Sequence, residues 1–327
     1  MQEPLVSIVV PCYNYGRFLG ACLEAIFRQD GEHSLEVIVI DDASTDETQD
    51  VLARFADPRL RAITHRKNQG HIASVSEGLL VSRGRILARI DADDRYKPWF
   101  LSETLAKFHA YPEVGFVYGD AALIDDEGKI TCERSDRIHD GRDFKGNEFI
   151  PLLFENFVCA PTGIGRREAW LEAMPLPPNL AFNDWYFNLM MARRHEFYYL
   201  SRVLAEYRIH RSNHHIKIVA DRTEESSIQY LLDCIFTETE VDPVLENAKQ
   251  AVRAKVYAAQ YLTLAEKYFG LNMNNDARRC YMRAARGRPS CLLRPAIVRR
   301  FAATLIGRHR YEAGKAFLKR HSSSSVG

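Results

Sequence analysis

The sequence lacks the features that hold a protein in a membrane or cross-link it through disulfides. None of its apolar runs approaches the roughly 20 residues needed to span a bilayer. Its first residues do not form a basic region followed by a long apolar one, so we expect no signal peptide. The 7 cysteines are scattered and show no Cys-x-x-Cys spacing, which argues against a disulfide framework or a structural zinc site. We therefore expect a cytoplasmic protein.

The chain also lacks a strong overall charge. Its 44 Lys and Arg residues balance 43 Asp and Glu residues, so the net charge of +1 does not point to nucleic acid as a partner. Hydrophobic residues make up 46% and charged residues 27%, which is typical of a globular protein with a buried core. The length of 327 residues favours one large domain followed by a second region.

Short apolar runs alternate with helical patterns in the N-terminal part of the chain. The runs typical of buried strands cover residues 5–10, 35–40, 60–64 and 86–90. Apolar residues at helical spacing lie between them, as in residues 18–27 and 72–81. This alternation predicts an α/β fold with a mostly parallel, doubly wound sheet. Further strands are expected at residues 114–118, 196–200 and 204–209, and further helices at residues 147–157, 167–174 and 183–194.

Polar residues directly follow three of these strands. They are Pro11 to Asn14, Asp41-Asp42, and Asp91 to Asp94. Ligands of open α/β sheets bind beyond the carboxyl ends of the strands, so these residues should meet at one crevice. Asp91 and Asp93 cannot stay close together, desolvated and charged without compensation, which a divalent cation such as Mg²⁺ or Mn²⁺ supplies. The alternatives are a solvated acidic turn and, for the segment after Asp41, a helix cap.

Four motifs occur in the order and spacing typical of glycosyltransferase family 2. They are Ser7 to Asn14, Val39 to Thr48, Asn68-Gln69-Gly70, and Ile90 to Asp94, and the resemblance extends over roughly residues 4 to 213. It implies a GT-A domain with a Rossmann-like, mostly parallel sheet and inverting transfer of a sugar from a nucleotide sugar. A phosphate loop of the type GxGxxG or GxxxxGKS is missing, which disfavours a dehydrogenase or a kinase.

The resemblance assigns the donor nucleotide to the strand ends. Pro11, Tyr13 and Asn14 would border the nucleotide, with Tyr13 against the base. Asp42 would bind the base, typically uracil. Asp91 would contact the ribose or a metal-bound water. The donor implied is therefore a nucleotide sugar, specifically a UDP-sugar.

The resemblance also supplies a metal site and a catalytic base. Asp93, with Asp91, would hold Mn²⁺ or Mg²⁺ between the two phosphates, and His210 is the candidate for a nitrogen ligand. Asp184, at the start of an expected helix, corresponds to the base that deprotonates the acceptor hydroxyl. Asn183 stands where the family commonly has Glu. The alternative for Asp184 is a helix cap, and the alternative for His210 is a structural role.

The acceptor side is assigned less directly. Asp120 and Thr162 fit the family pattern and would line the acceptor, unless they only form turns. The Gln-x-x-Arg-Trp segment of processive synthases is absent, which favours the addition of one sugar at a time. The resemblance implies a glycan or lipid-linked glycan as acceptor, in bacterial surface polysaccharide or lipopolysaccharide biosynthesis.

The chain changes character after the expected GT-A domain, which we place at residues 1–215. Residues 216–327 show helical patterns, and positive charge accumulates from Arg278 onward, with Glu312 the only acidic residue there. Apolar residues are interleaved at near-helical spacing. This pattern favours a helix lying on the anionic inner face of the cytoplasmic membrane. The alternatives are a helical cap with a solvated basic face and, less favoured, a nucleic-acid contact.

Two other functions are compatible with such a fold. A nucleotidyltransferase would also use a metal and strand-end Asp residues, but it should carry a Gly-rich loop with Lys or Arg after the first strand, which Pro11 to Gly16 lack. A non-catalytic nucleotide-sugar-binding module would keep the fold and lose the base or the metal ligands. The sequence thus favours a metal-dependent glycosyltransferase of the hexosyltransferase type.

Overall fold

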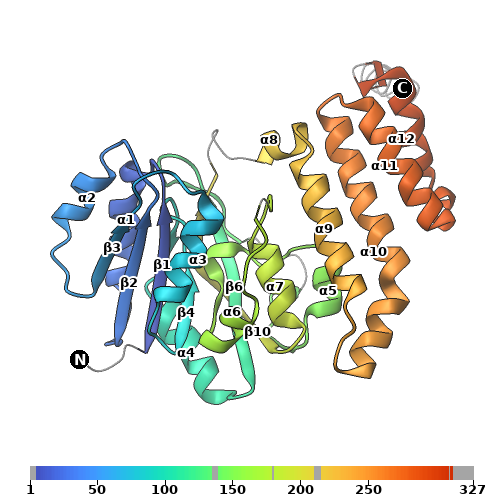
Figure 1. Cartoon of the computed structure of the whole chain (residues 1–327). Helices are drawn as coiled ribbons and strands as arrows, with labels where there is room; N and C mark the ends of the chain where they lie inside the picture. The colour runs from blue at the N-terminus through green and yellow to red at the C-terminus, as the bar shows by residue number, and fades with distance from the viewer. Residues whose placement is uncertain (1–4, 135–138, 179, 210–214, 309, 312–327) are drawn as a thin grey trace, which may run out of the picture. The chain divides into compact units, whose positions relative to one another are not determined.

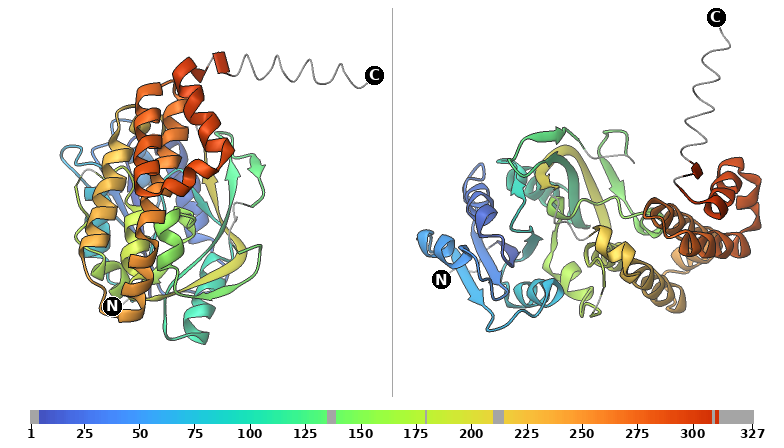
Figure 2. Two further views of the ribbon diagram at one scale, coloured as in Figure 1. Left: turned by 90° about the vertical axis from the view of Figure 1, so that its right-hand side faces the viewer. Right: turned by 90° about the horizontal axis from the view of Figure 1, so that it is seen from above.

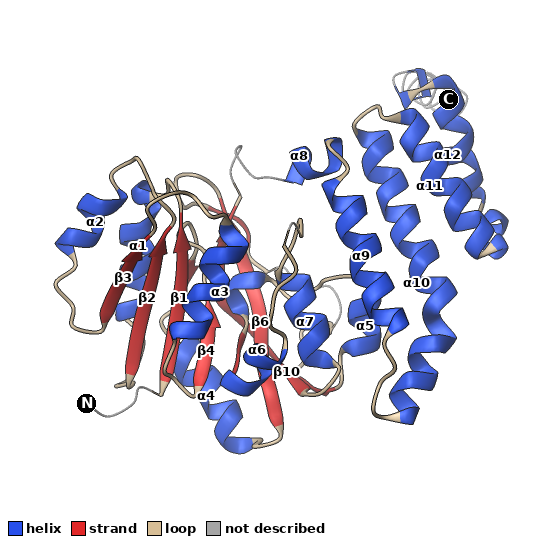
Figure 3. Cartoon of the chain, viewed as in Figure 1, coloured by secondary structure: helices blue, strands red, loops and turns tan. Residues whose placement is uncertain are grey.

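The computed structural model describes residues 5–134, 139–178, 180–209, 215–308 and 310–311. The chain divides into two compact units, Met1–Asn213 and His214–Gly327. All the strands of the described residues belong to the first unit, and the second unit consists of helices (Figure 3).

Four parallel strands form one half of the sheet in the first unit. They are β1 (Val6–Cys12), β2 (Leu35–Asp41), β3 (Leu60–Thr64) and β4 (Ile86–Arg89). Their order in the sheet is β3-β2-β1-β4, and neighbouring strands are parallel (Figure 1). The expected alternation of strands and helices is confirmed for this half.

The other half of the sheet is mixed. Short β9 (Ile164–Arg166) runs antiparallel between β4 and the long strand β6 (Val114–Ile124). β10 (Glu196–Arg208) is parallel to β6 and antiparallel to β5 (Arg95–Tyr96). Two further short strands pair with this half, β7 (Ile130–Cys132) with β6 and β8 (Phe144–Gly146) with β10.

One expectation for this half was wrong. The two strands expected at 196–200 and 204–209 are the single strand β10, whose register shifts between Leu200 and Val203 and again between Val203 and Ala205. The polar residues Ser201 and Arg202 lie at this irregularity, so they interrupt the apolar pattern without ending the strand.

Helices of the first unit connect these strands. Their bounds are α1 (Gly16–Phe27), α2 (Thr48–Arg54), α3 (His71–Val81), α4 (Phe100–Ala110), α5 (Phe149–Phe154), α6 (Arg167–Glu172) and α7 (Asp184–Ala192). A single 3-10 turn, η1 (Ala160–Thr162), precedes β9. The sequence pattern did not predict α4, and α5 is shorter than the helix expected at 147–157.

The core follows the two-residue period of the central strand. Ile8 and Val10 of β1 join the apolar cluster that includes Leu19 and Cys22 of α1. Val9 points to the opposite face, where its side chain packs against Gly78 of α3. Burial on both faces explains why β1 is apolar at every position except Ser7, rather than alternating between apolar and polar residues.

The loops after β1 and β2 pack closely against each other. A Cβ atom added to Gly16 would lie 2.6 Å from the backbone nitrogen of Thr48. The backbone N–H of Gly16 donates to Oδ2 of Asp46 over 2.8 Å. The start of α1 is therefore fixed against the loop that follows β2.

The second unit contains five helices within its described residues. They are α8 (His215–Ala220), α9 (Thr223–Thr237), α10 (Pro243–Gly270), α11 (Asn274–Gly287) and α12 (Pro295–Ile306), with the short turn η2 (Pro289–Leu293) before α12. The last three helices run alongside one another (Figure 2). Buried Glu225 joins α9 to α10 and α11, because it forms an ion pair with Arg279 of α11 and accepts a hydrogen bond from Tyr268 of α10. Within the described part of the chain, no helix combines the length and apolarity needed to cross a bilayer.

Candidate active site

The loops that follow β1, β2 and β4 begin at one edge of the sheet, because these strands are parallel neighbours. Cys12 at the end of β1 is in register with Asp41 at the end of β2, and the N–H of Asp42 donates to the carbonyl of Cys12 over 2.8 Å. On the other side of β1, the N–H of Ile90 donates to the carbonyl of Val9 over 3.0 Å. The polar segments after these strands therefore start from a common edge.

The end of β1 and the loop that follows it carry three of the predicted nucleotide-binding residues. Pro11 is buried within β1. Asn14 has a positive φ of 57°, its N–H donates to Oγ of Ser44 over 3.0 Å, and its Oδ1 accepts from the N–H of Thr45 over 2.8 Å. Tyr13 between them is 44% exposed. The neighbouring loop thus holds Tyr13 at the sheet edge with its ring accessible, which suits stacking against a planar ligand.

Asp42 is buried and already serves three donors. Its Oδ1 accepts from the N–H of Gln69 over 2.7 Å and lies 2.7 Å from Nδ1 of His65, while its Oδ2 accepts from the N–H of Gly70 over 2.8 Å. Burial opposes the charged form, but these hydrogen bonds outweigh it and lower the pKa of Asp42. A carboxylate has about four acceptor sites, so one remains for a ligand. Asp42 also fixes Gly70, which has a φ of 91° and directly precedes α3.

Arg89, Asn183, His71 and Asp91 form a closed ring of side-chain contacts. Nη1 of Arg89 donates to Oδ1 of Asn183 over 2.8 Å, and Nδ2 of Asn183 lies 3.1 Å from Nδ1 of His71. Nε2 of His71 lies 3.0 Å from Oδ1 of Asp91, and Nη2 of Arg89 lies 3.7 Å from Oδ2 of the same carboxylate. The ring joins β4, α3 and the start of α7. Burial opposes ionisation, but Arg89 and the contact with His71 lower the pKa of Asp91 well below its usual range.

The turn after β4 concentrates negative charge. Asp93 and Asp91 are half-buried, and Asp94 is 1% exposed. Arg208 holds this turn, since its N–H donates to Oδ1 of Asp94 and its Nε donates to the carbonyl of Asp93, each over 2.8 Å. Oδ2 of Asp94 is buried without a hydrogen-bond partner among the described residues. Burial, with the charges of Asp93 and Asp91, raises the pKa of Asp94.

These features fit a divalent cation. Three aspartate side chains within four residues, one of them with a buried oxygen that has no hydrogen-bond partner among the described residues, offer the oxygen donors that Mg²⁺ and Mn²⁺ prefer. Within the described ranges, however, no three or more His, Cys, Asp or Glu side chains are gathered so that they hold a metal unaided. Oxygen atoms from phosphate or water would have to complete the coordination. The expected ligand His210 lies outside the described residues.

Asp184 is the first residue of α7 and is half-buried. Its Oδ2 accepts from Nδ2 of Asn156 over 2.9 Å. Oδ1 of Asn156 in turn accepts from Nδ2 of Asn188 over 3.0 Å. Asp184 and Asn188 are four residues apart and therefore share one helix face. Asn156 bridges this pair and sets the direction of the Asp184 carboxylate.

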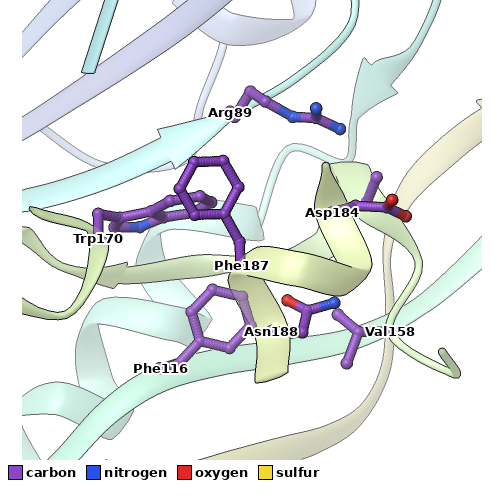
Figure 4. Close-up of a pocket in the computed structure, with 8 residues that line it drawn as sticks. Arg89, Phe116, Val158, Trp170, Asp184, Phe187 and Asn188 are labelled. Atoms are coloured by element: carbon purple, nitrogen blue, oxygen red, sulfur yellow. The ribbon is translucent and has the colours of Figure 1, made fainter. Parts of the chain in front are cut away.

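A small cavity of about 10 Å³ lies behind Asp184, with room for one water. Asp184, Asn188 and Arg89 supply its polar wall, and the rings of Phe116, Trp170 and Phe187 supply the opposite wall (Figure 4). Arg89 belongs both to this cavity and to the ring around Asp91. Asp184, the candidate base, is thus linked through Arg89 and Asn183 to the turn of residues 91–94, which we call the acidic turn.

The two residues expected on the acceptor side are buried. Asp120 on β6 is 2% exposed; its Oδ1 accepts from the hydroxyl of Tyr199 over 2.9 Å, and its Oδ2 is paired with Arg134. Thr162 in η1 is fully buried, and its hydroxyl donates to the carbonyl of Cys159 over 2.8 Å. The structure does not bring either side chain into the ring or the cavity.

Sequence reasoning missed most of the residues that hold the site together. His71, Arg89 and Asn156 were not singled out, although each contacts a predicted site residue. Arg89 could have been found, because a charged residue inside an apolar strand needs a buried partner. His71 and Asn156 have no such signal, because their roles depend on contacts between segments far apart in the sequence.

Comparison with known proteins places this geometry in a family. The sequence model of glycosyl transferase family 2 matches residues 7–174, which is more than half of the chain. An uncharacterized glycosyltransferase of Nostoc sp. strain PCC 7120 is 27% identical over 233 residues, which cover 68% of this chain and 70% of the relative.

Two solved structures share the fold. The mannosyltransferase PcManGT from Pyrobaculum calidifontis, in complex with GDP-Man and Mn²⁺, has a TM-score of 0.59 at 17% identity and covers 93% of this chain and 85% of its own. TarS 1-349 from S. aureus, in complex with UDP-GlcNAc, has a TM-score of 0.56 at 14% identity and covers 94% and 92%. At these identities the likeness establishes the GT-A fold alone. Together with the match to the family model, it shows that the chain belongs to glycosyl transferase family 2.

Proposed function

We propose that this protein transfers one sugar per encounter from a nucleotide sugar, specifically a UDP-sugar, to a hydroxyl of a glycan or lipid-linked glycan, with inversion at the anomeric carbon. The observation that carries this proposal is the ring of Arg89, Asn183, His71 and Asp91. It connects the acidic turn, on the donor side, to the first turn of α7, which bears Asp184. Holding donor and base in a fixed relation is what an in-line displacement requires.

The donor nucleotide would occupy the sheet edge after β1 and β2. Tyr13 would stack on the base, Pro11 and Asn14 would border it, and Asp42 would use its remaining acceptor site on a base N–H. Asp91 would contact the ribose or a metal-bound water. The UDP-GlcNAc in the TarS complex and the GDP-Man in the PcManGT complex support a nucleotide-sugar donor of this general kind.

A divalent cation, Mn²⁺ or Mg²⁺, would be held by Asp93 with help from Asp91. When bound, such a cation supplies positive charge against the departing nucleoside diphosphate. His210 stays part of this proposal as a nitrogen ligand. The Mn²⁺ in the PcManGT complex and the orphaned oxygen of Asp94 both support a cation at this turn.

Asp184 would accept the proton of the acceptor hydroxyl. The acceptor oxygen bonds to the anomeric carbon as the bond from that carbon to the diphosphate breaks, and the electron pair leaves with the diphosphate. Asn156 donates to Oδ2, so Oδ1 keeps both of its acceptor sites and is the oxygen we assign to take the proton. Asp120 and Thr162 are buried, so they would support the acceptor side rather than touch the sugar.

The setting we propose is bacterial surface polysaccharide or lipopolysaccharide biosynthesis, with the transfer site within residues 1–215 and the acceptor at the cytoplasmic face of the membrane. The test is incubation of the full chain with a panel of UDP- and GDP-sugars, with Mn²⁺, with Mg²⁺ or with EDTA. We expect slow release of UDP from one sugar nucleotide, and no release with EDTA. Release of pyrophosphate from a nucleoside triphosphate and a sugar phosphate would instead support a nucleotidyltransferase. Absence of any turnover alongside tight nucleotide-sugar binding would support a binding module.

A further inference from the structure

The outermost helix of the second unit exposes apolar and basic side chains on the same side. Val298, Leu305 and Ile306 of α12 are exposed, as is Leu293 in the turn before it, where the exposed fraction reaches 83%. Arg294 and Arg299, which flank this apolar strip, are also exposed. We call these six residues the basic apolar face. Exposed apolar residues that cluster on one helix face mark an interaction site more often than scattered ones do.

The opposite side of α12 fixes the helix in this orientation. Ala303 and Thr304 are buried against α11. Nη2 of Arg278 donates to the carbonyl of Thr304 over 3.0 Å, and the ring of Phe301 packs edge-on against Tyr281 at 6.3 Å. The helix therefore cannot turn its apolar strip inward without losing these contacts. Exposure of the basic apolar face is a consequence of how α12 is packed.

Charge selects the kind of partner. Residues 277–311 contain ten arginines and no acidic residue. A second copy of this chain bound through the same face by a two-fold axis would bring two arginine-bearing faces together, with no acidic residue in 277–311 of either copy to offset them. A neutral apolar partner would leave these guanidinium groups uncompensated. A surface that offers both negative charge and an apolar interior would pair with the arginines and would also bury the apolar side chains.

We propose that the basic apolar face is a docking surface for an anionic lipid bilayer. Leu293, Val298, Leu305 and Ile306 enter the boundary between headgroups and acyl chains, while Arg294 and Arg299 contact phosphate groups. Arginine suits this position because its planar fork matches the geometry of phosphate. The contact is peripheral. It does not depend on sugar transfer and is tested without any nucleotide sugar.

The experiment is sedimentation of the full chain with vesicles of pure phosphatidylcholine or of equimolar phosphatidylcholine and phosphatidylglycerol. We expect binding to the anionic vesicles alone, and release as salt is raised because the attraction is screened. Each arginine near an anionic surface accounts for roughly a fivefold change in partitioning. The double variant R294E/R299E should therefore bind at least about 25-fold more weakly. The double variant L293S/L305S should also lose binding.

Matched controls lie elsewhere in the same unit. Val241 and Val244 are exposed apolar residues, 96% and 76% exposed, and Lys255 is an exposed cation. V241S/V244S and K255E should bind anionic vesicles as the unaltered chain does. Circular dichroism verifies that every variant is folded. Equal sedimentation with both kinds of vesicle, or undiminished binding by R294E/R299E, would overturn the proposal. So would light scattering that finds a dimer lost in L293S/L305S without vesicle binding, because a second copy would then cover the face.

Discussion

The side-chain amide of Asn183 lies 3.1 Å from Nδ1 of His71, and this contact determines which ring nitrogen of His71 carries a proton. Arg89 can only donate hydrogen bonds, so the oxygen of the Asn183 amide must face Arg89. The NH₂ group then faces His71, whose Nδ1 must accept. The proton of His71 is therefore on Nε2, where it donates to Asp91.

Asn183 thus has a role that Glu, the common residue of the family at this position, could not fill in the same way. A carboxylate would accept from Arg89 and would also demand a donor from Nδ1 of His71. The closed set of contacts that includes Arg89, His71 and Asp91 would then carry one more negative charge. The amide keeps the ring connected without adding charge to a turn that already holds three carboxylates.

We expect Asn183→Ala to weaken both transfer and folding. Removal of the amide leaves Arg89, which is 5% exposed, without one acceptor and His71 without its donor. The free energy of unfolding should fall by about 1–3 kcal/mol. The value of kcat should fall about tenfold or more, because the acidic turn and α7 are no longer held together. Urea titration and steady-state kinetics measure the two effects.

Asn147→Ala is the matched control for this prediction. Asn147 also makes two side-chain hydrogen bonds, to the N–H of Phe149 and the carbonyl of Ala192, and takes no part in the ring. We expect a smaller loss of stability, because Asn147 is exposed, with kcat retained. If both variants lose activity in proportion to their stability, Asn183 is structural and has no positioning role.

Asp184→Asn should remove transfer while preserving donor binding. The amide oxygen of the new side chain can still accept from Asn156, so the start of α7 is retained, but it cannot take the acceptor proton. We expect kcat to fall by about a thousandfold or more, with little change in the Kd for UDP by calorimetry. Asp50→Asn is the control, because Asp50 is likewise an acid in a first helical turn, that of α2. Near-normal kcat in Asp184→Asn would assign the proton transfer to another group.

Much of the fold could be predicted because strands buried on both faces leave a clear pattern. Apart from Ser7 and Glu36, β1 and β2 are apolar runs followed by polar residues, and β3 begins and ends where the sequence indicated. The mixed half of the sheet was harder to predict from the sequence. β9 has three residues and β5 has two, which is too short for any periodicity to appear. Their pairing depends on β6 and β10, which lie far from them in the sequence.

The candidate site was predictable only in its motif residues. Asp91 and Asp93 stand directly after a strand, so their place at the sheet edge follows from topology. The ring contacts do not, since His71 and Asn183 are 112 positions apart and meet only through the packing of α3 and α7. Asp42 shows the opposite limit. Its position was predictable, but the three donors that already occupy its carboxylate were not.

Asp93→Asn should separate metal-dependent from metal-independent nucleotide binding. The amide offers a neutral oxygen in place of a charged one, which weakens the binding of a hard divalent cation. We expect the Kd for UDP in the presence of Mn²⁺ to rise about tenfold or more, and the Kd measured with EDTA to stay unchanged. Asp30→Asn, an exposed carboxylate between α1 and β2, should change neither value. A rise of equal size with and without Mn²⁺ would show that Asp93 acts on the nucleotide rather than on a cation.

His65 should make the protein less stable as the pH rises. Its two ring nitrogens each lie 2.7 Å from a carboxylate oxygen, one from Asp42 and one from Glu77, so both nitrogens donate and the ring is protonated. Burial works against this charge, but the two carboxylates outweigh it and raise the pKa of His65 above its ordinary value of 6.5. The folded state therefore holds this proton more tightly than the unfolded state does.

The contribution of His65 is thus complete below a pH of about 6.5 and is lost as the pH rises through the raised folded-state pKa. Urea titrations over this range should show the free energy of unfolding falling with pH. His65→Gln should be less stable at the acidic end and should lack this slope, because glutamine carries no titrating proton. His109→Gln, at an exposed position of α4, should keep the slope. A slope that persists in His65→Gln would mean that another group releases the proton and that the bridge between Asp42 and Glu77 does not depend on a charged ring.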